Sequence, residues 1–421
     1  MSAVRSVPDG TPGPRAAART VVTGLGVVTP NGLGTEAYWK ALLAGESGIT
    51  PLSRFDTTGY PATLAGEIRD FDAAEHLPSR LLPQTDVSTR YALAAADWAL
   101  ADAGVGPGSG LDDYDMGVVT STAQGGFDFT HREFRKLWAE GPEYVSVYES
   151  FAWFYAVNTG QISIRNGMRG PSAALVGEQA GGLDAVGHAR RTVRLGTRLV
   201  LSGGVDSAFD PWGWSAQTAG GRVSAARDPG RAYLPFDREA AGHVPGEGGA
   251  ILVVEDAESA RERGAATVYG EIAGYAATFD PAPGTGRPPG LRRAAELALA
   301  DAGLTPADIG VVYADAAALP APDRAEAEAL RGLFGPRGVP VTAPKTLTGR
   351  MCAGGGPADL AAALLTLRDQ VAPATAGTRS VPDEYGLDLV VGEPRAVAVR
   401  AVLVLARGRH GFNSAVVLTA P

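Results

Sequence analysis

The chain has 421 residues and contains very little cysteine or lysine. Its single cysteine, Cys352, excludes an internal disulfide and a zinc site built from cysteines. Lysine occurs only at Lys40, Lys136 and Lys345, and every other basic residue is arginine. A lysine in such a chain indicates a role that arginine cannot fill, such as that of Lys345. The alternative is that the three lysines are present by chance.

Excess positive charge and long apolar runs are also missing. There are 37 lysines and arginines against 46 aspartates and glutamates, so the net charge at pH 7 is −9. This balance excludes nucleic acid and anionic membranes as partners, because both require a basic surface. No apolar run approaches the ~18 residues that span a bilayer. We predict a globular cytoplasmic protein, with residues 1–18 as a disordered N-terminal tail.

An internal repeat is present instead. The sequence AADWALADAG at 95–104 recurs as AAELALADAG at 294–303, and each copy is followed by an apolar strand. Two copies of helix, loop and strand predict a duplicated α/β protein, whereas coincidence in an alanine-rich chain is the alternative. We predict an N-terminal half at 19–264 and a C-terminal half at 265–421.

A glycine-rich turn in the first half has the pattern of a nucleophile elbow. The strand SAALV at 172–176 runs into GEQAGG and then into a predicted helix. Such an elbow presents a reactive side chain at its apex and directs helix N–H groups at a substrate oxygen. Here the residue predicted at the apex is Gln179, whose amide is not a nucleophile. A simple helix cap is the alternative role for Gln179.

Three sequence blocks resemble those of the β-ketoacyl synthases in the thiolase-like superfamily, and they occur in the same order. They are VVTGLGVVTPNGLGTEAYWKALLAGESGI at 21–49, RAYLPFDREAAGHVPGEGGAILVVEDAESARERGA at 231–265 and GFNSAVVL at 411–418. The resemblance covers nearly the whole chain. It implies the thiolase-like α/β fold, in which two duplicated halves build five αβαβα layers.

The chain departs from an active member of that family where the chemistry takes place. In active members the elbow carries a cysteine, one histidine follows the strand that matches 311–314, and a lysine precedes a second histidine. This sequence has Gln179, Asp315 and Arg350 at those places and keeps only Lys345. Condensation requires a thiolate to hold the acyl chain. We expect Asp315, Arg350 and Lys345 to form a buried ion-pair network that fills the inactivated pocket.

The remaining polar candidates offer no replacement for the missing groups. The five histidines lie outside these motifs, and we expect surface or capping roles for all of them: His76, His131, His188, His243 and His410. A stand-alone condensing enzyme would have to use Cys352, which has no neighbouring histidine in the sequence. Arg409 replaces a phenylalanine of the family's terminal loop, and we expect it to be exposed to solvent or to face an acidic carrier protein.

The stretch GEQAGGLDA at 177–185 resembles one subfamily, the chain length factors or ketosynthase β subunits of type II aromatic polyketide synthases. These subunits pair with a catalytic ketosynthase α subunit, and the heterodimer extends malonyl units held on the phosphopantetheine of an acyl carrier protein into a poly-β-ketone. The resemblance implies a non-condensing subunit that sets chain length, without a bound cofactor or metal. The alternative is a malonyl-acyl carrier protein decarboxylase that makes the acetyl primer through Gln179.

Two aromatic clusters are candidates for the tunnel and the subunit interface. Phe127, Thr130 and Phe134 fall at i, i+3 and i+7 on one face of a predicted helix. Periodicity alone favours core packing for this face, but the resemblance places the helix at the interface, beside the closed end of the tunnel. A second cluster is Phe151, Trp153, Phe154 and Tyr155. Such enrichment indicates an obligate interface, with core packing as the alternative.

Overall fold

The central sheet is built from two sets of strands that follow one another along the chain. The structure, a computed structural model, describes residues 18–106, 109–282 and 284–421. In the N-terminal half the strands are β1 (Thr20–Thr29), β5 (Met116–Ser121), β6 (Ser172–Leu175), β7 (Leu199–Asp206) and β8 (Gly248–Asp256). In the C-terminal half they are β9 (Gly270–Phe279), β10 (Val311–Tyr313), β11 (Pro340–Thr342), β15 (Ala401–Arg407) and β16 (Phe412–Thr419).

The two halves share one topology. The strand order is β6-β5-β7-β8-β1 in the first half and β11-β10-β15-β16-β9 in the second, where β13 (Asp388–Leu389) adds an outer edge. In each half the first three strands are parallel, and the last two are antiparallel to their neighbours. Antiparallel pairing of β1 with β9 joins the halves into one sheet. The predicted duplication of an α/β unit is therefore confirmed.

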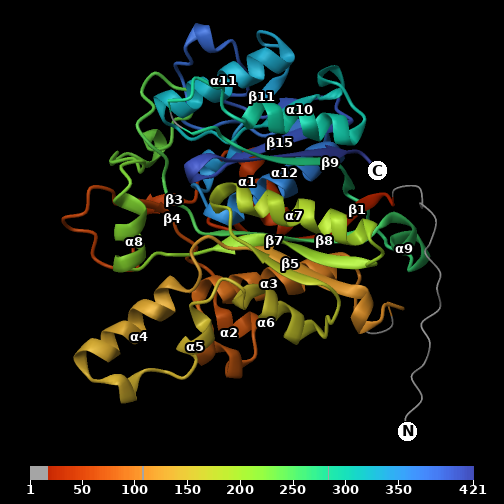
Figure 1. The fold of residues 1–421 in the computed structure, drawn as a ribbon. Helices are drawn as coiled ribbons and strands as arrows, with labels where there is room; N and C mark the ends of the chain where they lie inside the picture. Colours follow the sequence, from red (N-terminus) through yellow and green to blue (C-terminus); the bar gives the residue numbers. More distant parts are fainter. Residues whose placement is uncertain (1–17, 107–108, 283) are drawn as a thin grey trace.

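Helices form three layers around the two half-sheets (Figure 1). The outer layers contain α3 (Val87–Asp102) and α6 (Val157–Asn166) on one side, and α10 (Leu291–Ala302) and α11 (Pro320–Phe334) on the other. The middle layer contains α1 (Thr35–Ala44), α7 (Glu178–Arg194) and α12 (Gly355–Asp369). Both α7 and α12 contact strands of both halves. This arrangement confirms the five αβαβα layers.

Shorter elements connect these layers and flank them. They are β2 (Gly32–Leu33), β3 (Ile49–Pro51), β4 (Leu64–Gly66), α2 (Ala73–His76), α4 (Phe127–Ala139), α5 (Glu149–Ala152), α8 (Pro211–Thr218), α9 (Ala257–Glu262), β12 (Val371–Ala372) and β14 (Arg395–Ala396). The proposed division after residue 264 lies between α9 and β9, and the proposed tail lies outside the described residues except for residue 18. No helix within the described ranges is long and apolar enough to cross a membrane.

The repeated sequence makes the same contact in both halves. In each half a helix, α3 or α10, packs on a glycine of a strand, β1 or β9. A Cβ on Gly24 of β1 would lie 2.2 Å from the carbonyl oxygen of Ala99 and 2.8 Å from the Cβ of Ala103. A Cβ on Gly274 of β9 would lie 2.1 Å from the oxygen of Ala298 and 2.9 Å from the Cβ of Ala302. The repeated alanines and their glycine partners therefore let α3 and α10 approach the sheet closely.

We expect Gly24→Ala to destabilise the protein by about 1–3 kcal/mol, because the new methyl group would collide with backbone that cannot move freely. The matched control is Gly160→Ala in α6, where a Cβ meets open space. That change should be neutral or stabilising by up to about 1 kcal/mol. Urea unfolding of both variants measures the difference, and equal effects would contradict the packing argument.

Candidate functional site

The strained residue of the elbow is Glu178. Strand β6 ends at Leu175, and α7 begins at Glu178 with a positive φ of 52°. A Cβ on Gly181 would lie 2.4 Å from the Oγ of Ser121, so the first turn of α7 packs closely on the end of β5. The prediction that Gln179 stands at the apex is wrong by one residue. The Glu178 side chain, and not that of Gln179, faces the neighbouring cavity.

Gln179 is sealed inside the middle layer. Its side chain has no exposed surface, and neither amide atom has a hydrogen-bond partner among the described residues. A Cβ on Gly355 would lie 2.3 Å from its Nε2, which shows how closely the amide packs on the start of α12. The side chain makes no capping bond to α7, so the capping alternative is also wrong.

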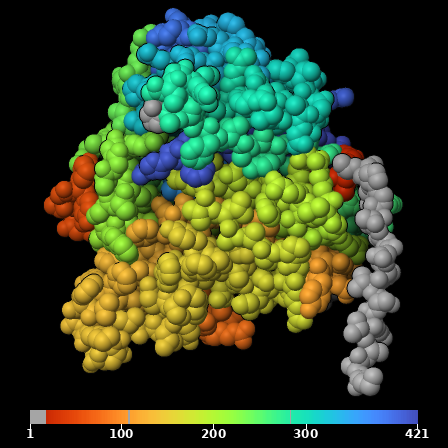
Figure 2. All heavy atoms as spheres, viewed as in Figure 1, coloured from red at the N-terminus to blue at the C-terminus, as the bar shows by residue number. Residues whose placement is uncertain are grey.

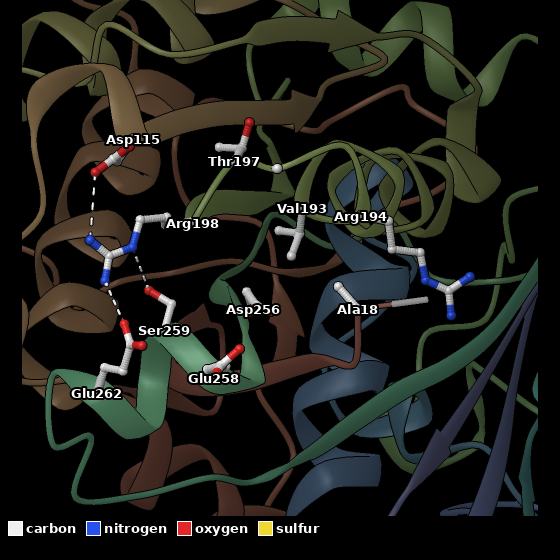
Figure 3. A pocket seen from close by; sticks show the side chains of 11 residues that line it. Ala18, Asp115, Val193, Arg194, Thr197, Arg198, Asp256, Glu258, Ser259 and Glu262 are labelled. Carbon is white, nitrogen blue, oxygen red and sulfur yellow. Dashed lines mark hydrogen bonds and ion pairs between the residues drawn. The ribbon is translucent and has the colours of Figure 1, made fainter. Parts of the chain in front are cut away.

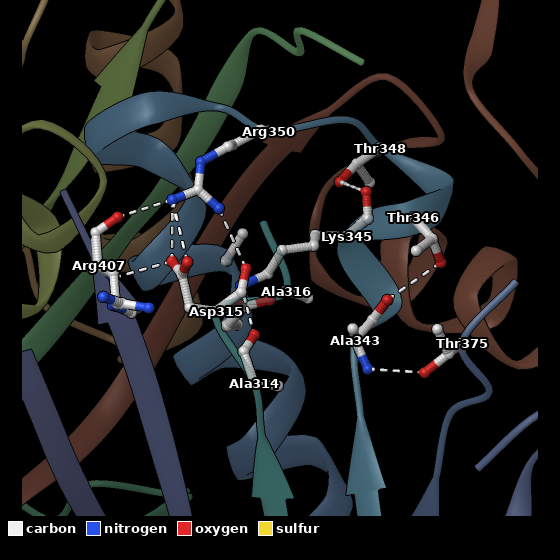
Figure 4. Close-up of polar contacts among 12 residues, drawn as sticks. Ala314, Asp315, Ala316, Ala343, Lys345, Thr346, Thr348, Arg350, Thr375 and Arg407 are labelled. Carbon is white, nitrogen blue, oxygen red and sulfur yellow. Dashed lines mark hydrogen bonds and ion pairs between the residues drawn. The ribbon is translucent and has the colours of Figure 1, made fainter. Parts of the chain in front are cut away.

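Asp315 and Arg350 form a fully buried ion pair (Figure 4). The guanidinium Nη2 of Arg350 donates to Asp315 Oδ1 at 2.9 Å and Oδ2 at 3.2 Å, and also to the carbonyl of Arg407. The backbone N–H of Arg407 donates to Asp315 Oδ1 at 2.8 Å. Burial opposes ionisation, but Arg350 and Lys345 hold the pKa of Asp315 below its usual range.

Lys345 lies in the same cluster but pairs with a different carboxylate. Its Nζ is 2.7 Å from Asp359 Oδ2, and both side chains are almost completely buried. The ammonium also donates to the carbonyl oxygens of Ala314 at 2.7 Å and Asp315 at 3.2 Å. The expected network therefore contains a fourth member, Asp359, which sequence reasoning missed. Asp359 lies on α12, fourteen residues beyond Lys345, next to an apolar run of six residues.

A cavity of about 190 Å³ lies beside the elbow and has a polar end. That end is formed by Glu178, His243, Arg350, Cys352 and Arg409. The expectation of surface or capping roles is wrong for His243, which is buried. Burial, followed by the charges of nearby arginines, holds the pKa of His243 well below its usual range. The imidazole is therefore neutral at physiological pH and adds no charge to the cavity.

Cys352 and Arg409 both line this cavity, and only Arg409 differs from the expectation. Burial and nearby carboxylates raise the pKa of the Cys352 thiol, so it stays protonated and is a poor nucleophile. Arg409 is only about one-third exposed. Its backbone N–H donates to Glu178 Oε2 at 2.9 Å, and its Nε lies 3.8 Å from Glu178 Oε1. The terminal loop is thus held against the elbow.

The predicted face of α4 meets a tryptophan that sequence reasoning missed. Trp212 of α8 lies between Phe127 and Phe134, with ring centroids 4.9 Å and 5.7 Å away. Thr130 is buried, but Phe134 and Trp212 remain 39% and 43% exposed. The face is therefore a stack at the surface and not a core contact. The PWGW sequence after β7 could have indicated Trp212, but only the fold shows that α8 faces α4.

A second cavity, of about 150 Å³, lies on the outer side of this stack. Trp153, Tyr155 and Trp212 contribute aromatic walls, and Thr130 lies at its base. Gln124 and Phe127 line both this cavity and the one beside the elbow. Phe127 and Gln124 are therefore the wall between the two spaces.

The second predicted cluster is largely exposed. Trp153 and Phe154 are each 48% exposed and Tyr155 is 38% exposed, while Phe151 is half-buried. Helix α5, which carries Phe151, contacts α4, and the region of α4 projects from the N-terminal half at the lower left of Figure 2. We call Phe134, Trp153, Phe154, Tyr155 and Trp212 the aromatic surface. Strand β6 is the end strand of the sheet and is itself half-exposed, so a backbone edge is also free.

A further cavity, of about 310 Å³, lies at the opposite end of α7 and away from the elbow (Figure 3). Arg198 donates to Ser259 Oγ at 2.9 Å and lies 3.7 Å from Asp115 and 3.5 Å from Glu262. Arg198 thus pairs with two of the acidic side chains that line this cavity. None of the predicted site residues lines this cavity.

Comparison with known families agrees with this architecture and assigns its class. The N-terminal domain of β-ketoacyl synthases matches residues 17–260, and the C-terminal domain matches residues 269–379. The chain therefore belongs to the β-ketoacyl synthase family. Within that family it falls among the ketoacyl synthase β subunits, or chain length factors, of type II polyketide synthases, as its sequence predicted.

Several relatives are similar over almost the whole length of both chains. The granaticin polyketide putative β-ketoacyl synthase 2 of Streptomyces violaceoruber is 73% identical over 95% of this chain and 96% of its own. The tetracenomycin ketoacyl synthase β subunit of Streptomyces glaucescens is 61% identical over 96% and 98%. The solved ishigamide ketosynthase/chain length factor is 28% identical, with a TM-score of 0.88 over 96% of this chain and 100% of that one.

We expect Asp315→Asn to destabilise the protein by about 3–5 kcal/mol at pH 7, because it leaves a buried cation unpaired. The lowered pKa means that the carboxylate contributes above the unfolded-state pKa and loses its contribution as the pH falls through the folded-state value. The difference from the unaltered protein should therefore shrink in acid. Urea unfolding at several pH values measures it, and Asp315→Asn/Arg350→Gln should recover part of the loss. A single variant as stable as the parent would refute the role of the pair.

Proposed function

We propose that this chain is the non-condensing β subunit of a type II polyketide synthase and sets the length of the poly-β-ketone made with a catalytic ketosynthase α subunit. The observation that carries the proposal is the pairing of an elbow without a nucleophile with an exposed aromatic stack directly beside it. An enzyme acting alone would need a reactive side chain at the elbow. A subunit that binds a partner would need the aromatic stack to be exposed.

The elbow cannot perform condensation. Acyl transfer needs a thiolate, and Gln179 stands where the family has its cysteine. Stabilisation of a developing oxyanion needs hydrogen-bond donors, but Asp315 presents an ionised carboxylate whose oxygens only accept. Arg350 donates, yet both of its terminal nitrogens already donate to Asp315 or Arg407. The former active site serves as an internal ionic support.

The stack on α4 supplies the closed end of the product tunnel. Phe127 separates the outer cavity from the elbow cavity, so a chain that enters from the partner side meets this ring first. Thr130 and Phe134 continue the same face. The growing chain is carried on the phosphopantetheine of an acyl carrier protein in the cytoplasm, and the β subunit contributes shape without a cofactor of its own.

The partner covers the aromatic surface and the free edge of β6. Exposed aromatic residues of this size are typical of the centre of an obligate interface. Strand β6 is the end strand of the sheet among the described residues, and its outer edge offers backbone N–H and C=O groups to a second sheet. Phe151 is half-buried, and its ring contacts Tyr148. These features suit a ketosynthase α subunit of the same fold.

The alternative function, malonyl decarboxylation through Gln179, has no observation in its favour. Its amide is fully buried, and it is not among the residues that line the elbow cavity. A malonyl group would have to displace α12 to reach it, because Gly355 is in direct contact. Gln179 fills space between α7 and α12.

We expect Phe127→Ala to lengthen the product by at least one malonyl-derived unit, because removing the ring joins two cavities that it now separates. Phe134→Ala should do the same to a smaller extent. The measurement is the size distribution of polyketides from cells that co-express the subunit with its ketosynthase partner and carrier protein. Phe279→Ala, an exposed phenylalanine outside the aromatic surface, is the control. Unchanged product length in Phe127→Ala would refute the proposed function.

We expect Trp153→Ala to weaken heterodimer formation by about 2 kcal/mol or more, roughly a 30-fold rise in Kd, because large aromatic side chains dominate interface energetics. Leu195→Ala is the matched control, since Leu195 is also highly exposed but lies at the other end of α7. Affinity of each purified variant for the ketosynthase partner gives the comparison. Equal affinities in the two variants would exclude Trp153 from the interface.

A further inference from the structure

We propose that two buried aspartates, Asp86 and Asp206, are positioning residues that hold the start of α4 and thereby determine the product length. This inference rests on the proposed function, because it concerns the wall formed by Phe127 and Gln124. Neither aspartate reaches a cavity or a partner surface. Each acts through backbone N–H groups of the segment that carries the wall.

Asp206 holds the loop that leads into α4. It lies at the end of β7 with no exposed surface. Its carboxylate accepts hydrogen bonds from the hydroxyl of Thr122 and from the backbone N–H groups of Ala123 and Gln124 at 3.0–3.1 Å. It also accepts from the N–H of Ala353 at 2.9 Å, in the short turn η7 (Cys352–Gly354) before α12. One carboxylate therefore ties the wall to the middle layer.

Asp86 holds the first turn of α4 from a different layer. It caps α3 by accepting from the N–H of Ser88 at 2.8 Å, and its second oxygen accepts from the N–H of Phe129 at 2.9 Å. Helix α4 has no local side-chain cap at Gly126. The first N–H groups of a helix need such an acceptor. Asp86, which is 43 residues away in sequence, supplies it.

Both carboxylates accept several hydrogen bonds at once, which few other side chains of that size can do. Burial raises the pKa of each to about 6, while the donors that surround them favour the ionised form. An asparagine of the same size has a single acceptor oxygen and places an NH₂ group against backbone donors. Such a change leaves buried N–H groups without an acceptor and frees the segment to move.

The position of Phe127 depends on the hydrogen bonds that Asp86 and Asp206 accept. Gly126 has no spare room, because a Cβ there would lie 2.1 Å from the oxygen of Ala152. The backbone on either side is gripped by Asp206 through Gln124 and by Asp86 through Phe129. In the chain, Phe127 lies between these two anchored residues, so loosening either anchor lets the wall between the cavities open.

The experiment compares Asp86→Asn and Asp206→Asn with a buried aspartate elsewhere. Asp323→Asn in α11 is the matched control, because Asp323 is also buried, has a pKa raised to about 7 by burial and accepts from the N–H of Phe236. Each subunit is co-expressed with its partner. Two quantities are measured: the product size distribution, and backbone hydrogen exchange of residues 122–133 in the purified heterodimer.

We expect both wall variants to raise hydrogen exchange in residues 122–133 by about tenfold or more and to shift part of the product to longer chains. Asp323→Asn should lower the unfolding temperature while leaving exchange in that segment and product size as in the parent. If an asparagine variant does not fold, Thr122→Val leaves the carboxylate in place and removes the hydroxyl that donates to Asp206 and accepts from the N–H of Gly125. A smaller change in the same direction is expected.

The outcomes separate this inference from the proposed function. Longer products from Phe127→Ala together with parental product size and parental exchange in Asp206→Asn and Thr122→Val would overturn the role of the aspartates alone. A product shift of equal size in Asp323→Asn would also overturn it, because a general loss of stability would then explain the effect. Unchanged product length in Phe127→Ala would overturn the proposed function itself, while the exchange measurement would still report on the anchors.

Discussion

The close contact between α7 and α12 in the middle layer determines the geometry of everything around the elbow. It exists because glycines face the opposing helix: a Cβ on Gly182 would lie 2.4 Å from the Cδ of Pro357, and one on Gly356 would lie 2.9 Å from Leu183. At this distance Gln179 is enclosed between the two helix starts. The same contact places the turn before α12 within reach of Asp206.

Buried ion pairs occupy the positions around this contact where active members of the family have catalytic groups. Four ionised groups, Asp315, Arg350, Lys345 and Asp359, lie buried in two adjoining pairs. Such groups are stable in an interior only when every charge has a partner and the remaining donors are used. Here the spare donors of Arg350 and Lys345 go to backbone carbonyls. The cluster therefore keeps the pocket filled and rigid, although it can neither hold nor activate a substrate.

The molecule combines a closely packed interior with an exposed aromatic surface. Ionic pairs and close helix contacts hold the middle layer, whereas among the described residues no element covers the aromatic surface on α4, α8 and the segment after α5. Buried carboxylates connect the two regions, since Asp206 and Asp86 reach from the sheet and from α3 to the start of α4. The start of α4 is therefore held from the interior although its aromatic face lies at the surface.

Patterns local in sequence could be predicted without the structure. The repeat at 95–104 and 294–303 predicted the duplicated halves because helix–strand contacts within each half recur at the same positions. Alignment of short motifs located Gln179, Asp315, Lys345 and Arg350, because each lies in a motif that keeps its spacing. Aromatic spacing identified the face of α4, since a helix brings i, i+3 and i+7 together.

Contacts between distant segments were decided only by the tertiary structure. Glu178 takes the strained position because the turn is one residue earlier than its glycines suggested, and His243 reaches the elbow cavity from a loop 65 residues beyond it. Trp212 joins the stack because α8 packs beside α4. Hydrogen bonds and packing depend on distance in space, and a sequence fixes that distance only through the complete fold. The chain alone therefore determined its family and its lost nucleophile, whereas the fold decided which side chains build the wall and hold it in place.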